Sequence, residues 1–231
     1  MDNAIEADAL GKRYGRRWAL ADCTLTVPAG QVVGLVGPNG AGKTTLLELA
    51  VGLVRPTTGT ITVRQRAGFV AQGAPVYGGL SVADHLRMGQ ALSTRWDAGL
   101  ARRRVDEAGL DLRQRAGRLS GGQRAQLALT LAVAKRPGLL VLDEPAANLD
   151  PLARRDFLDS VTRAVAASGE SMTVVFSSHL VADLERTCGY VILLAGGQVR
   201  LADPVDKLLA AHNHSRSLDD LVISYLREVP R

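Results

Sequence analysis

The chain has 231 residues, of which 46% are hydrophobic and 22% are charged, a balance that excludes a disordered protein. Its longest apolar runs, such as Leu139–Leu142, fall far below the roughly 18–20 residues that span a bilayer, so no transmembrane helix is predicted. Two cysteines are too few for a disulfide framework or a zinc site, and the acidic N-terminus lacks a signal-peptide pattern, so we expect a cytosolic protein. The formal charge of +5 is spread over 28 basic and 23 acidic residues along the chain, which does not favour a nucleic-acid surface.

Short β-branched runs alternate with longer helical patterns, which predicts an α/β architecture. Three of the runs, Val32–Val36, 139–143 and 173–177, are nearly all apolar. Such runs are typical of central strands in a parallel sheet that is covered on both faces. The other strand candidates lie at 5–10, 24–27, 59–63 and 190–194.

Between about residues 75 and 136 the strand signals vanish, and helical patterns replace them. This stretch predicts a helical subdomain inserted into a mixed-sheet domain. From about 204 to 231 we expect a C-terminal tail of one or two amphipathic helices. The predicted helices of the inserted stretch are Val82–Leu92, 98–108 and 123–134.

The segment 37–45, with the sequence GPNGAGKTT, contains G-x-x-x-x-G-K-[ST] in full. It follows the apolar run Val32–Val36 and precedes a helical pattern at 45–54, the context that this motif requires. Backbone N–H groups of such a loop point at phosphate oxygens, while its lysine, Lys43, reaches the β- and γ-phosphates and the Thr44 hydroxyl ligates Mg²⁺. The motif therefore predicts binding of a nucleoside triphosphate by Gly37, Pro38, Asn39, Gly40, Ala41, Gly42, Lys43, Thr44 and Thr45.

A second glycine motif, L-S-G-G-Q at 119–123, precedes another helical pattern. Ser120 and Gln123 have the spacing of a capping box, so an ordinary helix start accounts for those two residues. It does not account for Gly121 and Gly122, because glycines in a first turn cost stability unless something approaches the backbone closely. A helix N-terminus with bare N–H groups and a serine hydroxyl offers a second phosphate site.

Asp143 and Glu144 follow four apolar residues that predict a buried strand. A carboxylate at the end of such a strand needs a partner to stay charged, and Mg²⁺ is that partner for Asp143. Successive strand residues point to opposite faces, so Glu144 is expected to act on an attacking water as general base. An ordinary helix start is the alternative for an isolated Asp-Glu pair, but the phosphate loop in the same chain favours the catalytic interpretation.

These motifs resemble those of the ABC ATPase family, whose signature sequence is L-S-G-G-Q between a phosphate loop and an Asp-Glu strand end. The resemblance covers residues 9 to about 202. It implies a P-loop NTPase of ABC type in a single domain, 1–231, that hydrolyses ATP with Mg²⁺. It also implies a homodimer or pseudo-dimer of ATPase domains, with ATP between the phosphate loop of one subunit and residues 120–123 and Asp150 of the other.

Single residues receive roles from the same resemblance. Tyr14 corresponds to the aromatic residue that stacks on adenine, although Trp18 lies close enough to compete for that role. Gln72 corresponds to the glutamine that contacts Mg²⁺ and water, and His179 to the histidine that holds the γ-phosphate. The catalytic set implied in this way is Glu144, His179, Gln72 and Lys43, and the metal set is Thr44, Gln72 and Asp143.

Three classes of ABC protein compete for this chain. Only about 75 residues separate Lys43 from Ser120, which leaves no room for the coiled coil of the DNA-maintenance class. Translation factors carry two cassettes, and this chain has one. The resemblance therefore implies the ATPase subunit of a transporter, held at the cytoplasmic face of the cell membrane by a separate transmembrane permease, with no nucleic-acid partner. The segment 80–86 is most similar to bacterial drug and lipid exporters, so export is expected; the cargo is not encoded in this chain.

Overall fold

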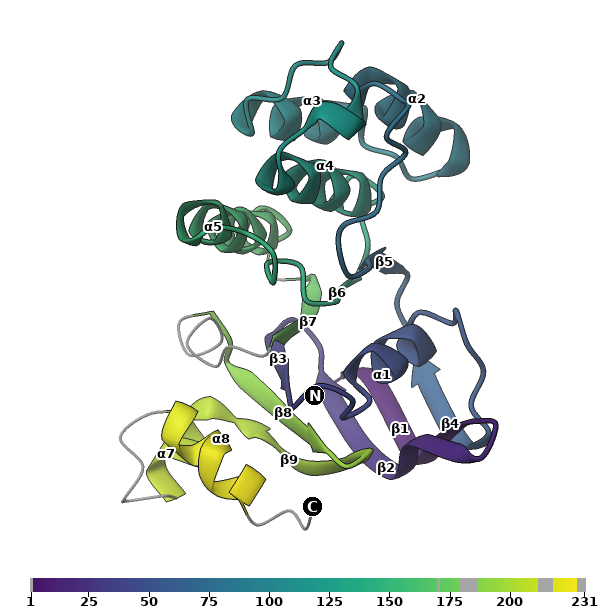
Figure 1. Ribbon diagram of the computed structural model, residues 1–231, viewed down its shortest axis with the longest axis vertical. Helices are drawn as coiled ribbons and strands as arrows, with labels where there is room; N and C mark the ends of the chain where they lie inside the picture. The colour runs from purple at the N-terminus through teal and green to yellow at the C-terminus, as the bar shows by residue number, and fades with distance from the viewer. Residues whose placement is uncertain (1, 170, 179–186, 212–217, 228–231) are drawn as a thin grey trace.

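The computed structural model describes residues 2–169, 171–178, 187–211 and 218–227. These residues form a six-stranded mixed sheet and a three-stranded antiparallel sheet with helices packed around them (Figure 1). None of the described helices is long and apolar enough to cross a membrane. The strands are β1 (Asn3–Tyr14), β2 (Arg17–Pro28), β3 (Val32–Val36), β4 (Thr58–Val63), β5 (Ala67–Val70), β6 (Leu139–Leu142), β7 (Thr173–Ser178), β8 (Tyr190–Ala195) and β9 (Gln198–Pro204). The helices are α1 (Lys43–Ala50), α2 (Val82–Leu92), α3 (Ala98–Glu107), the 3₁₀ turn η1 (Ala116–Arg118), α4 (Gly121–Val133), α5 (Pro151–Ala167), α7 (Val205–Ala211) and α8 (Leu218–Arg227).

The larger sheet has the strand order β5-β6-β7-β3-β8-β9, with all neighbours parallel except β8 and β9. Every residue of β6, β7 and β8 is buried, as the apolar runs predict for strands covered on both faces. Because β3, β6 and β7 run parallel, their carboxyl ends lie at one edge of the sheet. Ligands bind at such an edge in open α/β sheets.

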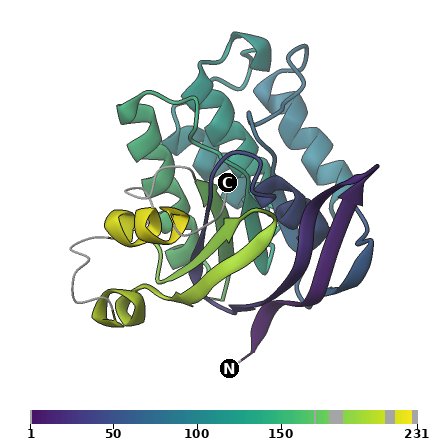
Figure 2. The same cartoon turned by 60° about the horizontal axis from the view of Figure 1, so that its bottom comes forward.

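The smaller sheet, β2-β1-β4, packs beside the larger one and encloses α1. Leucines of α1, Leu46, Leu47 and Leu49, lie in one buried cluster with residues of both sheets. Figure 2 shows the purple strands of the smaller sheet on one side of the molecule and the yellow helices α7 and α8 on the other. The phosphate-loop segment is thus held between two sheets.

The helical part of the chain, α2 to α4, has a small core of its own, which includes Val82, Val105 and Leu127. Ser81 begins α2 with a full capping box, since its side chain accepts from the Asp84 backbone and the Asp84 carboxylate accepts in return from the Ser81 backbone. Helix α4 also packs on α5, which joins this part to the sheet, as Figure 1 shows. The predicted fold class, an α/β mixed sheet with inserted helices, is confirmed.

Several predicted bounds differ from the structure. The helix predicted at Val82–Leu92 has those bounds, whereas the strand predicted at 139–143 ends at Leu142. Two strands were not predicted: β5 has only four residues, one of them glycine, and β9 is a half-exposed edge strand. The predicted tail begins at Pro204, the last residue of β9, and contains the short helices α7 and α8. Residues 212–217 and 228–231 lie outside the described residues.

Candidate functional site

The phosphate-loop segment joins β3 to α1 in a conformation that requires glycine. Gly42 precedes α1 with φ of 104°, in the left-handed region. A Cβ atom at this position would lie 2.5 Å from the Ala19 carbonyl oxygen and 2.7 Å from Leu20 Cδ2. No side chain caps the first turn of α1, so backbone N–H groups there remain available to an anion.

A cavity of about 430 Å³ opens above this loop. It brings together the β1–β2 hairpin, the loop with the start of α1, the second residue after β5 and the second residue after β6 in one site. Gly37, Pro38 and Ala41 belong to the loop without lining the cavity. The lining residues are Tyr14, Arg17, Ala19, Asn39, Gly40, Gly42, Lys43, Thr44, Thr45, Gln72 and Glu144.

Lys43 is the buried cation of the site, with 5% of its surface exposed. Its Nζ donates to the carbonyl oxygens of Gly37, at 2.8 Å, and Pro38, at 3.3 Å. The same atom lies 3.4 Å from Glu144 Oε1. The ammonium group is therefore held at the loop by two carbonyl groups and one carboxylate.

The direction of the Glu144 side chain is not set by strand alternation, contrary to the prediction from the sequence. Strand β6 ends at Leu142, and Glu144 has φ of 42°, so a left-handed turn of the backbone sets its direction and not strand alternation. Gln72 Nε2 donates to Glu144 Oε2 over 3.3 Å. The two carboxylate oxygens of Glu144 thus contact two predicted site residues at once.

Asp143 is 1% exposed and is held by Ser177, a residue that the sequence analysis missed. The Ser177 hydroxyl donates to Asp143 Oδ1 at 2.7 Å and accepts from the Glu144 backbone N–H at 2.8 Å. The available signal was a polar residue near the end of the otherwise apolar run 173–177. Arg17 was missed as well, and it lines the cavity next to Tyr14 in the hairpin.

The donor chemistry of this edge fits Mg²⁺. Mg²⁺ prefers hard oxygen ligands and is usually bound through one or two carboxylates together with substrate phosphates and water. Thr44 supplies an exposed hydroxyl group in the cavity, and the Asp143 carboxylate lies at the end of the neighbouring strand. Among the described residues, no group of three or more His, Cys, Asp or Glu side chains gathers as a metal cluster.

The aromatic residues near the loop differ in placement. Tyr14 lines the cavity and is 48% exposed, with Lys12 Nζ 5.1 Å from its ring centroid. Trp18 does not line the cavity, and the Arg13 guanidinium lies 5.4 Å from its ring centroid. Tyr14 is thus the better placed of the two for stacking on a base.

The second glycine motif, residues 119–123, lies outside the Lys43 cavity, at the start of α4. Ser120 and Gln123 form the complete capping box of α4, and Gly122 packs closely on α5, where a Cβ atom would lie 3.0 Å from Ala153 Cβ. No comparable contact is found at Gly121, where the nearest atom to such a Cβ is 3.6 Å away. Ser120, Gly122 and Gln123 line a cavity that shares no residue with the one at Lys43.

Asp150 and His179 are the remaining predicted site residues. Asp150 is exposed and caps α5, accepting from the N–H groups of Leu152 and Ala153 at 3.0 Å each. His179 lies outside the described residues.

Comparison with known proteins decides the family. The family model described as ABC transporter matches residues 20–147. The chain belongs to the ABC transporter family. It is an ATPase domain of that family, as the sequence resemblance implied.

Some relatives of this ABC ATPase domain are named for import and others for export. It is 35% identical to the aliphatic sulfonates import ATP-binding protein of Shigella flexneri, over 97% of this chain and 90% of the relative. It is 34% identical to the Nod factor export ATP-binding protein I of Cupriavidus pinatubonensis, over 84% of this chain and 64% of the relative. The expected preference for export therefore finds no support.

A solved structure, the ATP-binding subunit of an ABC transporter, has the same fold with a TM-score of 0.82. It is 26% identical to this chain, and the match covers 96% of this chain and 99% of that one. The chain spans less than two thirds of the length of some curated relatives, 64% in the case of the Nod factor protein.

Proposed function

We propose that this ABC ATPase domain binds ATP with Mg²⁺ in the Lys43 cavity, hydrolyses it there, and powers a transmembrane permease. The observation that carries the proposal is the convergence of Lys43, Glu144 and Gln72. The Lys43 ammonium group and the Glu144 carboxylate lie 3.4 Å apart beside the phosphate loop, and Gln72 donates to the same carboxylate. No side chain caps the helix that follows the loop. Phosphoryl transfer needs positioning and charge stabilisation, which this set supplies.

Each residue receives one role in this scheme. The loop N–H groups and Lys43 hold the β- and γ-phosphates, and Tyr14 stacks on the base. Thr44 and Asp143 would hold Mg²⁺, with Gln72 beside them, and bound Mg²⁺ would offset the charge of the phosphate oxygens. Glu144 accepts a proton from the attacking water, and Ser177 keeps Asp143 and the Glu144 backbone in place.

The unit of function in this proposal is a pair of domains. The cavity at Ser120 and Gln123 shares no residue with the Lys43 cavity, so an anion site at α4 serves the ATP of a second subunit. Asp150 joins that contact, and His179 completes the γ-phosphate site. We propose a single ATPase domain over 1–231, held peripherally at the cytoplasmic face of the membrane through the permease. The proposal includes neither a cargo nor a transport direction.

Replacing Glu144 with glutamine tests the catalytic half of the proposal. Glutamine keeps the size of the side chain and removes its basicity, so the rate of ATP hydrolysis should fall by roughly 10²–10⁴-fold. Equilibrium binding of ATP should persist. Glu6→Gln, the same change at a half-exposed position of β1 outside the Lys43 cavity, should hydrolyse ATP at the normal rate. Near-normal turnover in Glu144→Gln would remove Glu144 from the role of base.

Co-purification tests the transport half. The full chain, expressed in its native host with an affinity tag and extracted from membranes, should bring with it a protein with several membrane spans. Tight binding to ribosomes or DNA without any membrane protein would instead favour the alternative, a non-transport ABC ATPase in translation or DNA maintenance. The two outcomes differ even where ATP hydrolysis is the same.

A further inference from the structure

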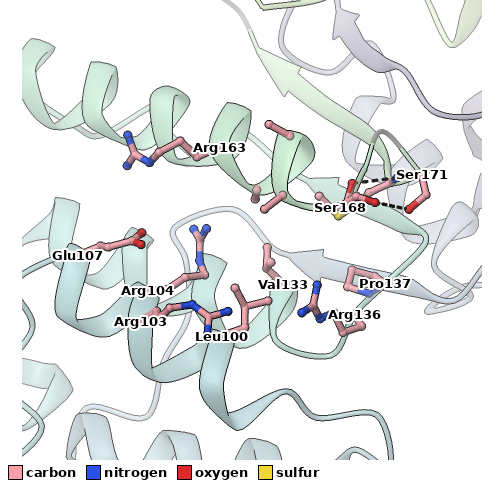
Figure 3. A pocket seen from close by; sticks show the side chains of 14 residues that line it. Leu100, Arg103, Arg104, Glu107, Val133, Arg136, Pro137, Arg163, Ser168 and Ser171 are labelled. Atoms are coloured by element: carbon pink, nitrogen blue, oxygen red, sulfur yellow. Dashed lines mark hydrogen bonds between the residues drawn. The ribbon is translucent and has the colours of Figure 1, made fainter.

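A third cavity, of about 470 Å³, lies between α3 and the C-terminal half of α5 (Figure 3). It shares no residue with the Lys43 cavity. Part of its wall is apolar and includes Leu100, Val133 and Met172. The charged residues that line it are four arginines and one glutamate: Arg103, Arg104, Glu107, Arg136 and Arg163.

Arg104 is the buried member of this set, with 6% of its surface exposed. One guanidinium nitrogen donates to Ser160 Oγ at 3.1 Å, while Nε is buried with no hydrogen-bond partner among the described residues. Burial lowers the pKa of Arg104, although a guanidinium still keeps its proton in proteins. The Glu107 carboxylate nearby offsets part of the cost of burying this charge, and the Arg163 guanidinium adds to it. A second anion close to Arg104 would lower that cost further.

The charge around the cavity is not balanced by the described residues. Arg136 pairs with Asp97 at 2.5 Å, and no ion pair within the described chain includes Arg103, Arg104 or Arg163. Four arginines thus face two carboxylates, Glu107 and Asp97, which leaves a surplus of two positive charges. Figure 3 shows Arg104 and Arg163 toward one end of the cavity, with Ser168 and Ser171 at the other.

We propose that this cavity binds a small organic anion, with a phosphate or carboxylate head at Arg103, Arg104 and Arg163 and an apolar body against Leu100 and Met172. Guanidinium groups present forked donors that match both head groups. The volume lies within the roughly 300–1,000 Å³ of small-molecule sites. Arg104, Glu107 and Arg163 also line the neighbouring cavity at Ser120 and Gln123. The inference does not depend on the chemistry proposed for the Lys43 site.

Calorimetric titration with octyl phosphate tests the site. Arg163 is exposed, so Arg163→Gln should fold normally and should weaken octyl phosphate binding about tenfold or more, as the loss of a charge-assisted contact predicts. Arg102→Gln is the control, because Arg102 is an exposed arginine on α3 next to Arg103, pairs with Asp106 and does not line the cavity. Its affinity should stay within about twofold of the wild type. Lys43→Ala removes the buried cation of the phosphate loop, which could compete for the phosphate head, and should leave octyl phosphate binding unchanged.

Two further ligands separate the head group from the body. Octanoate replaces the phosphate head by a carboxylate, and tighter binding of one of the two identifies which head the arginines select. The neutral 1-octanol should bind at least about tenfold more weakly than the better anion. The proposal is overturned by equal affinity for 1-octanol, by binding lost in Lys43→Ala and kept in Arg163→Gln, or by no saturation with either anion at about 5 mM.

Discussion

The Ser177 hydroxyl donates a hydrogen bond of 2.7 Å to Asp143 Oδ1, between the ends of two neighbouring parallel strands. The same hydroxyl oxygen accepts from the backbone N–H of Glu144 at 2.8 Å. Ser177 is fully buried, so water does not replace it in either role. One side chain thus fixes the positions of the two acidic residues that the proposed chemistry uses.

Ser177→Ala should therefore lower both stability and ATP hydrolysis. It leaves a buried carboxylate oxygen and a backbone N–H group without a partner, which costs roughly 1–3 kcal/mol in the free energy of unfolding. Urea denaturation of the wild type and of Ser177→Ala measures this difference in the free energy of unfolding. Thr162→Ala on the exposed face of α5 is the control and should change stability by less than about 0.5 kcal/mol. Equal stability of Ser177→Ala and the control would show that the hydroxyl does not hold the acidic pair.

Gly42 and Gly52 allow the cost of close packing to be separated from the cost of backbone conformation. Both have positive φ, 104° and 75°, but a Cβ atom at Gly42 would meet backbone and side-chain atoms whereas one at Gly52 would meet nothing within 4 Å. Gly52→Ala should cost about 1–2 kcal/mol in unfolding free energy for its left-handed conformation alone. Gly42→Ala should cost roughly 1–3 kcal/mol more, because α1 must move away from β2.

Urea denaturation also measures this pair, with ATP binding as a second readout. Gly52→Ala should bind ATP normally, since Gly52 lies at the C-terminal end of α1, away from the loop. Gly42→Ala should bind it weakly. Equal unfolding free energies for the two variants would contradict the close contact of Gly42 with Ala19 and Leu20.

Most of the fold could be predicted from the sequence because the strongest sequence signals are local. The apolar runs of β3, β6 and β7 predict buried parallel strands, and parallel strands bring Lys43, Asp143 and the end of β7 to one edge. The pattern of the helix Val82–Leu92 begins at a serine that caps it, which is why its bounds were predicted correctly. The edge strand β9 lacks such a pattern, since its residues are mostly half-buried on both faces.

Parts of the site depended on contacts that no local pattern contains. The direction of Glu144 comes from a left-handed backbone conformation immediately after β6, and alternation along a strand does not extend past the strand end. Ser177 is 34 positions from Asp143 in the sequence, and no local pattern around Ser177 predicts that the two residues form a hydrogen bond. The need for glycine at position 122 also depends on a distant residue, because Ala153 of α5 packs closely against it.

Under the proposed mechanism, Gln72→Ala should lower kcat more than it raises KM for ATP. Gln72 donates to Glu144 Oε2, so its loss leaves the base free to turn away, and a misplaced base lowers the rate about tenfold or more. Stability should change by less than about 0.5 kcal/mol because Gln72 is exposed. Gln90→Ala, an exposed glutamine on α2, is the matched control with unchanged kcat. An unchanged kcat in Gln72→Ala would show that this contact does not position Glu144.

The buried thiol of Cys188 should make the protein less stable at alkaline pH. Burial raises the pKa of Cys188 above its ordinary value, so the folded state keeps the proton that the unfolded state releases above about pH 8.5. The unfolded state then binds fewer protons, the slope of unfolding free energy against pH is negative, and roughly 1 kcal/mol is lost between pH 7.5 and 9.5. Urea denaturation at the two pH values should show a smaller loss in Cys188→Ala. Any cavity cost of the substitution is common to both pH values and cancels in the comparison. Burial raises the pKa of Cys23 too, so a weaker alkaline slope should persist in the variant; parallel losses in the two proteins would contradict the role given to Cys188.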